Sequence, residues 1–323
     1  MELNTYQRYL VEEFADDYHE EHLDRRDLLK KVLAVTGSIP VAAAVLTSLG
    51  CGSPATQAKT TASPAVATAT ATPARPTPAP TNVTRAGATV LPTDPAIEVS
   101  DVKFKGPASD ILVYLARPKG NGPFPGVIVI HENAGLTEHN RDIARRFAKE
   151  GFAAFAIDLV SRFGGTKTES NENTGFLGRA NPDDLVADLV STVGYMKTQP
   201  FVKPSALGVV GFCFGGGYAW ETAIASPDIK AAVPFYGPVR LVDKVSTTNA
   251  AVLGMYASND TRITGTIPAV EEKMKAAGKT YEAKVFQGAN HGFFNDTRAT
   301  TWSEAAASEA WPLTLSWLRK YLV

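Results

Sequence analysis

The stretch that decides the fold reads LGVVGFCFGGGYAW and runs from Leu207 to Trp220. Its first half is a run of apolar and small residues, which is typical of a buried β-strand, and its second half is a glycine-rich helix start. Cys213 stands between them, so the stretch predicts a sharp strand-to-helix turn with a cysteine at its tip. Gly211 and Gly215 lie two residues to either side, where bulky side chains would clash with the strained backbone of such a turn.

Strand-like and helical stretches alternate along the chain around this turn. GVIVIHE and FAAFAIDL are continuous apolar runs that end in polar residues, whereas EHNRDIARRFAKEG and NPDDLVADLVSTVGYMKTQ have helical spacing. Continuous apolar strands that alternate with helices indicate an α/β fold with a mainly parallel sheet covered on both faces. The predicted domain spans residues 96–323, which is long enough for a large core.

Composition narrows the classes of partner. The chain has 323 residues, a formal net charge of -1 and 44% hydrophobic residues, which suits a globular enzyme. No long Lys/Arg block is available to neutralise phosphates, so nucleic acid is not an expected partner. No His/Cys cluster has the spacing of metal ligands, so we expect neither a metal nor another cofactor.

Residues 1–51 resemble a twin-arginine export signal. Arg25 and Arg26 precede a moderately apolar run that continues to Gly50 and contains Gly37 and Pro40. These interruptions make the run a poor permanent membrane span, whereas a signal is an address read by a translocase. The acidic leader VEEFADDYHEEHLD is long for such a signal, and an uncleaved N-terminal helix is the alternative.

The motif TSLGC, which ends at Cys51, is similar to a lipoprotein processing site, with Ser48 where an aliphatic residue is usual. Lipidation of Cys51 would anchor the protein to a membrane surface, and simple cleavage of the signal is the other interpretation. In either case we expect an exported protein, periplasmic or at the cell surface. Residues 52–95 are rich in Ala, Thr and Pro and lack aromatic residues, which predicts a disordered linker.

Polar residues with catalytic chemistry follow the predicted strands. Glu132, Cys213, Asp260 and His291 each come just after a strand-like run, and the carboxyl ends of parallel strands meet at one sheet edge. The order nucleophile, acid, histidine is that of α/β-hydrolases. Taken one at a time, Cys213 could be a small buried residue, Asp260 a helix cap, His291 a loop histidine and Glu132 a surface carboxylate. Their occurrence together favours catalysis by a Cys-His-Asp triad.

The motifs HENAGL, DLVSR, GFCFGG, ASND and NHGFF together resemble those of the dienelactone hydrolase (carboxymethylenebutenolidase) family over residues 96–323. The resemblance implies an α/β-hydrolase fold, with Cys213 as nucleophile, His291 as base and Asp260 as the acid that orients it. It also implies that Glu132 contacts the thiol in the resting enzyme and helps to form the thiolate.

Three further roles are implied by the resemblance. The backbone N–H groups of Phe214 and Asn133 would form the oxyanion hole, and Arg162 of DLVSR would contact a substrate carboxylate. A second family arginine after the catalytic histidine is missing, since Asn295 stands near its place and Arg298 follows later. This departure leaves the preference for an anionic lactone open. The loop 163–181 is either a flap over the site or a surface insertion.

The function expected from these observations is that of a carboxylic ester hydrolase. Cys213 would attack a small-molecule ester or lactone, and water would then hydrolyse the acyl-thioester. The alternative from another class is a catalytically silent binding module that has the same fold and is tethered by the N-terminal segment.

Overall fold

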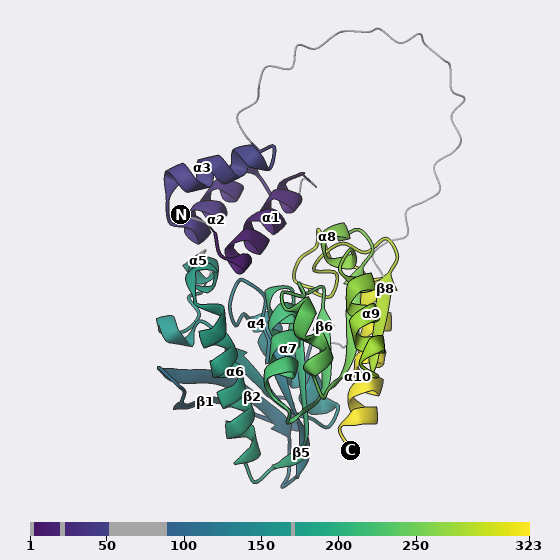
Figure 1. Ribbon diagram of the computed structural model, residues 1–323. Coiled ribbons are helices and arrows are strands. Elements are labelled where there is room, and N and C mark those ends of the chain that lie inside the picture. Colours follow the sequence, from purple (N-terminus) through teal and green to yellow (C-terminus); the bar gives the residue numbers. More distant parts are fainter. Residues whose placement is uncertain (1–2, 20–22, 52–88, 169–171) are drawn as a thin grey trace, which may run out of the picture.

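The computed structural model describes residues 3–19, 23–51, 89–168 and 172–323 (Figure 1). Eight strands form one sheet within these ranges: β1 (Ile97–Lys105), β2 (Asp110–Pro118), β3 (Phe124–Ile130), β4 (Ala153–Asp158), β5 (Val202–Phe212), β6 (Ile229–Phe235), β7 (Ala251–Ala257) and β8 (Tyr281–Phe286). The helices in the same ranges are α1 (Thr5–His19), α2 (Arg25–Thr36), α3 (Ile39–Ser48), α4 (Glu138–Lys149), α5 (Glu172–Arg179), α6 (Pro182–Lys197), α7 (Phe214–Ala225), α8 (Thr261–Thr264), α9 (Ile267–Ala276), α10 (Glu304–Tyr321), and the 3-10 turns η1 (Ser161–Phe163) and η2 (Val242–Thr247).

The sheet has the strand order β1-β2-β4-β3-β5-β6-β7-β8. β2 pairs antiparallel with both β1 and β4, whereas every pairing from β4 through β3 to β8 is parallel. The parallel strands β3, β4, β5, β6 and β7 are buried along most of their length, as continuous apolar runs predict. The predicted α/β class is therefore confirmed.

Helices cover both faces of this sheet. On β5, a side chain at Gly208 would meet Leu318 of α10, while on the neighbouring β3 a side chain at Gly126 would meet Met196 of α6. Gly126 is in register with Leu207, the residue before Gly208, and successive residues of a strand point to opposite faces. α6 and α10 therefore pack on opposite faces. α4 shares the face of α10, where the rings of Phe147 and Trp311 are 4.7 Å apart.

The N-terminal segment forms the three helices α1, α2 and α3, which lie beside α5 at one end of the α/β domain (Figure 1). Arg25 and Arg26 begin α2 and are exposed, whereas Cys51 is buried with its Sγ 3.5 Å from His19 Nε2. Among the described helices, none is by itself long and apolar enough to cross a membrane; α2 and α3 meet that test only as a pair, with a bend of 119° between them.

Most of the expected linker, residues 52–88, lies outside the described residues. Its last part belongs to the folded domain, because Val90 is buried and its backbone N–H donates to Asp142 Oδ1 at 2.7 Å. The backbone carbonyl of Val90 also accepts from Arg145 Nε. Val90 is thus bound to α4 although it precedes Ala96; with Leu91 it forms a short apolar pair among polar and small residues, which gave no periodic signal.

Candidate active site

Cys213 lies at the tip of the turn between β5 and α7. Its backbone has φ 55° and ψ -120°, a conformation that a side-chain-bearing residue rarely adopts, and its N–H is held by Phe235 O at 3.0 Å. A Cβ at Gly211 would stand 2.0 Å from Gly215 O, and one at Gly215 would stand 2.5 Å from His131 O. The two glycines are therefore required by backbone contacts that no rotamer change relieves.

His291 and Asp260 reach the same place from the ends of β8 and β7. Asp260 Oδ2 is 2.6 Å from His291 Nδ1, and Asp260 also accepts from Ile263 N at 3.3 Å as the N-cap of α8. A carboxylate at this position accepts a hydrogen bond from Nδ1–H, which fixes the orientation of the ring and leaves Nε2 as the nitrogen available to the thiol. His291 Nε2 is buried and has no hydrogen-bond partner among the described residues.

The charges of the site shift the pKa values of its members. Burial opposes protonation of His291, but the neighbouring Cys213 and Asp260 outweigh burial and leave the pKa of His291 well above its usual value. Burial also raises the pKa of the Cys213 thiol, and the negative charge of Glu13 raises it further. Asp260 is buried too, yet His291 holds the pKa of its carboxyl below the usual range.

Glu132, at the end of β3, is turned to a different partner from the expected one. It is buried, and its Oε2 accepts a hydrogen bond of 2.7 Å from Asn295 Nδ2. The negative charge of Glu132 is the largest influence on the guanidinium of Arg298 and raises its pKa. The thiol of Cys213 makes its carboxylate contacts with Glu13 instead. Asn295 and Arg298, which depart from the family pattern, thus both act on Glu132.

Of the two expected oxyanion-hole residues, Phe214 follows Cys213 directly, and Asn133 reaches the thiol through Glu13, which accepts from Asn133 Nδ2 at 3.0 Å and lies 3.4 Å from Sγ. Phe214 is the first residue of α7, so its N–H is not used by the helix itself. Asn133 lies in the loop after β3, where its carbonyl accepts from Thr174 Oγ1 at 3.1 Å. His131 fixes this loop: its Nε2 accepts from Leu159 N at 3.0 Å, so its Nδ1–H donates to Glu132 O at 2.6 Å.

Arg162, which is expected to contact a substrate carboxylate, is held by α6 in this structure. Its guanidinium is engaged by α6, with Nε 2.6 Å from Asp188 Oδ2 and another nitrogen 2.9 Å from the carbonyl of Asp184. Asp188 is buried, and a buried carboxylate needs such a partner. The arginine is therefore tied to the core side of α6 and does not contact the triad residues. The matching motif located the loop after β4 but gave no information on Asp188, which is contributed by another helix.

The loop 163–181 carries the helix α5, whose preceding residues 169–171 lie outside the described residues. Asn173 at its start donates to the carbonyls of Ala134 and Lys167, and Thr174 holds Asn133. The loop is thus fastened to the segment that follows β3.

The thiol has two neighbours that the sequence did not suggest, and both come from α1. Cys213 Sγ lies 3.4 Å from each carboxylate oxygen of Glu13 and 3.6 Å from Tyr9 Oη. An oxygen of Glu13, the Sγ atom and a ring nitrogen of His291 all lie within 4.8 Å of one another, which is close enough for one metal ion to bind all three. The helical spacing of Tyr6, Leu10 and Phe14, which begins before the acidic leader and continues into it, was the signal that could have indicated a packed helix.

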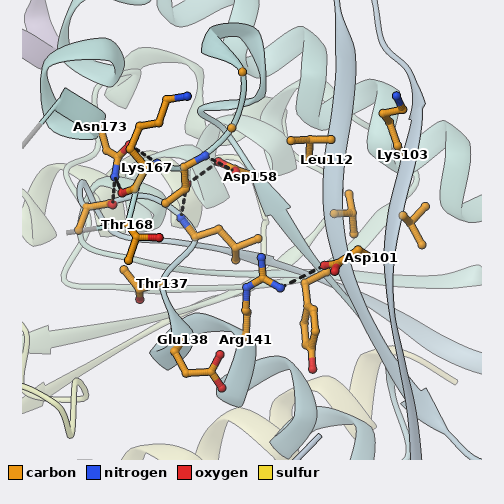
Figure 2. Close-up of a pocket in the computed structure, with 18 residues that line it drawn as sticks. Asp101, Lys103, Leu112, Thr137, Glu138, Arg141, Asp158, Lys167, Thr168 and Asn173 are labelled. Atoms are coloured by element: carbon orange, nitrogen blue, oxygen red, sulfur yellow. Dashed lines mark hydrogen bonds and ion pairs between the residues drawn. The ribbon is translucent and has the colours of Figure 1, made fainter. Parts of the chain in front are cut away.

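A large hollow in the described structure lies elsewhere, with a volume of about 860 Å³ (Figure 2). Its walls come from β1, β2, the start of α4 and the loop after β4, and Arg141 crosses it to Asp101 at 3.1 Å. It contains none of Cys213, Asp260 and His291. The space beside the thiol is instead filled by α1.

Comparison with known proteins places this geometry in a family. The model of the dienelactone hydrolase family matches residues 111–322. A protein of Methylorubrum extorquens and one of Escherichia coli K12, both named "Putative carboxymethylenebutenolidase", are each 32% identical over 251 residues, or 73% of this chain and 86% and 92% of theirs. The crystal structure of a "Putative Dienelactone Hydrolase" from Klebsiella pneumoniae is 32% identical, covers 70% of this chain and all of its own, and has a TM-score of 0.65. The chain therefore belongs to the dienelactone hydrolase family of carboxylic ester hydrolases.

Proposed function

We propose that the chain hydrolyses a small-molecule ester or lactone by a Cys213–His291–Asp260 triad. The observation that supports this best is the buried Nε2 of His291, which has no hydrogen-bond partner in the described structure while Nδ1 is bound to Asp260 at 2.6 Å. A ring nitrogen beside a thiol on a strained turn, with the other ring nitrogen bound to a carboxylate, has the arrangement of a general base beside its nucleophile.

The reaction would proceed in two halves. The Cys213 S–H proton passes to His291 Nε2, and the sulfur attacks the carbonyl carbon while the N–H groups of Phe214 and Asn133 bind the oxyanion. Collapse of this intermediate breaks the C–O bond, and His291 gives its proton to the leaving alkoxide. A water molecule then loses a proton to His291 and attacks the thioester, which releases the acid and returns the proton to sulfur.

Substitution of the nucleophile tests this assignment. Cys213→Ala is expected to reduce hydrolysis of a p-nitrophenyl ester by about three orders of magnitude or more, because the covalent route is lost. Cys51→Ala, which removes the other cysteine, is the matched control and is expected to retain activity. Equal and measurable turnover by Cys213→Ala and the unchanged chain would assign the chemistry to another group. Absence of turnover in both, and also in Glu13→Ala, where the carboxylate beside the thiol is removed, would favour the silent binding module.

We further propose that residues 1–51 direct export and that Cys51 is a lipidation site. Exposure of Arg25 and Arg26 at the start of α2 supports recognition by a translocase. Cys51 is buried, so its acylation requires α1, α2 and α3 to leave their present position. The double substitution Arg25→Lys, Arg26→Lys should keep the protein in the cytoplasm; recovery of the exported form in undiminished amount would contradict the signal.

A further inference from the structure

Helix α1 is anchored beside the site by Tyr6. The ring of Tyr6 stacks on Tyr218 of α7 with centroids 4.6 Å apart and planes at 10°, and its hydroxyl donates to Glu221 Oε1 at 3.0 Å. Arg240 holds the same carboxylate at 2.8 Å. A Cβ at Gly217 would stand 2.9 Å from the Tyr6 hydroxyl. Gly217, one helical turn after Cys213, therefore leaves the space that the Tyr6 hydroxyl occupies.

A second anchor joins the N-terminal helices to α5. A Cβ at Gly175 would stand 2.8 Å from the carbonyl of Ala34 in α2, and one at Gly178 would stand 3.1 Å from Val35. Asn4 donates to the carbonyl of Gly178 at 3.2 Å. α2 and α5 thus pack with their backbones in close approach, at a contact that includes none of Cys213, Asp260 and His291.

One turn beyond Tyr9, Glu13 is presented to the reacting atoms. Its two oxygens each lie 3.4 Å from Cys213 Sγ, Oε1 accepts from Asn133 Nδ2 at 3.0 Å, and Oε2 is 4.0 Å from His291 Nε2. The side chain is buried. A carboxylate against the nucleophile, the base and the loop of the oxyanion hole is in the position that the acid product of acyl-thioester hydrolysis would occupy.

These contacts exclude substrate. A carbonyl carbon has to come within about 3 to 3.5 Å of the sulfur to react, and the Glu13 carboxylate and the Tyr9 hydroxyl hold that space. Arg262 also holds α1 at this point: its guanidinium lies 4.7 Å from the centre of the Tyr9 ring and pairs with Asp16 at 3.3 Å.

We propose that the mouth of the active site is a binding surface for α1 of the same chain, with Glu13 in the place of the acid product, so that the intact chain is latent. Its effect on hydrolysis rests on the proposed function, whereas the binding surface itself does not. An ester reaches Cys213 only when residues 3–19 leave the site. The same segment is part of the proposed export signal, residues 1–51, so processing at Cys51 would remove the covering helix together with the rest of the signal.

The test measures access to Cys213 and turnover separately, on full-length chains with EDTA present to exclude a metal bridge. Access is the rate at which iodoacetamide alkylates Cys213, followed by peptide mass spectrometry so that Cys51 is counted apart. Turnover is the hydrolysis of p-nitrophenyl acetate. The variants are Glu13→Ala, Tyr6→Ala and Gly178→Val, the last of which acts at the α2–α5 contact. The matched control is Glu12→Ala, because Glu12 precedes Glu13 on the same helix.

Each of the three variants is expected to raise the alkylation rate of Cys213 about tenfold or more, since each removes contacts that hold α1 in place. Glu12→Ala should behave as the unchanged chain. Turnover should rise in parallel for Gly178→Val and Glu13→Ala. If alkylation rises and no chain hydrolyses the ester, the binding surface stands and the hydrolase assignment fails.

Two results would overturn the proposal. Alkylation rates that stay at the level of the Glu12→Ala control in Glu13→Ala and in Gly178→Val would show that α1 does not cover the thiol in solution. A loss of turnover in Glu13→Ala, without faster alkylation and with full turnover in Gly178→Val, would make Glu13 a participant in the reaction and not its blocker.

Discussion

Gly211→Ala is expected to destabilise the protein far more than a glycine-to-alanine change usually does. The added Cβ would stand 2.0 Å from the carbonyl oxygen and 2.5 Å from the carbonyl carbon of Gly215, and both atoms belong to the buried backbone of α7. No side chain can turn away, so the helix itself has to move by about 1 Å to restore a normal contact. Overpacking of this kind costs about 3 kcal/mol or more.

The free energy of unfolding, obtained from urea titration, measures this cost, and Gly194→Ala is the matched control. Gly194 lies in α6 with nothing within 4 Å of an added Cβ, so the same substitution there is expected to stabilise the protein by about 0.5 to 1 kcal/mol. Hydrolysis should fall at least about a hundredfold in Gly211→Ala because the thiol is displaced. A stability within about 1 kcal/mol of the unchanged chain would refute the claim that the turn admits only glycine there.

Two further predictions concern buried ion pairs. Hydrogen bonds from His139 and Arg146 outweigh burial and hold the pKa of the Asp296 carboxyl well below its usual value. The stability that ionised Asp296 contributes to the folded state is therefore fully present above the unfolded pKa of about 4 and is lost as pH falls below it. Asp296→Asn should therefore lower the free energy of unfolding by about 3 kcal/mol at pH 7 and by progressively less below pH about 4, and a difference that is constant with pH would contradict this. Arg162→Gln leaves Asp188 buried without its 2.6 Å partner and should lower the free energy of unfolding by about 3 kcal/mol. The KM for an anionic ester should stay unchanged, and a raised KM would instead indicate that Arg162 binds the substrate.

The sheet, and the meeting of Cys213, Asp260 and His291 at its edge, were predictable because their signals are local. Continuous apolar runs identify buried parallel strands, and polar residues at the ends of such strands have to meet at one edge. Cys213, Asp260 and His291 are brought together for that reason. The glycines beside Cys213 are required by contacts within the same turn, so their spacing is visible in the sequence.

Partners contributed by other elements were not predictable in this way. Arg162 lies next to the strand end that the motif indicates, but its direction is set by Asp188, a residue 26 positions later on α6. Glu132 has the right position, yet its side chain is held by Asn295, which is 163 residues away. Position in a motif determines where the backbone lies, whereas the direction of a polar side chain depends on which hydrogen-bond or ionic partners lie within its reach.

The N-terminal segment shows the same limit most clearly. Its paired arginines and apolar run indicate an export signal, while its leader also buries Tyr6, Leu10 and Phe14 against the hydrolase domain. An apolar helix face that docks on a protein and one that is read by a translocase have similar composition. The contact between Glu13 and Cys213 spans 200 residues and depends on the tertiary structure alone.

The central claim is that Cys213 carries the acyl group during hydrolysis, and trapping that group tests it most directly. The unchanged chain and Glu13→Ala are mixed with p-nitrophenyl acetate, quenched in acid during turnover and mapped by peptide mass spectrometry. The account predicts an acetyl group on the peptide that contains Cys213, lost on treatment with hydroxylamine as a thioester should be, with a larger fraction labelled in Glu13→Ala. Sustained turnover with the acetyl group on another side chain, or with Cys213 unmodified and its alanine variant equally active, would contradict it.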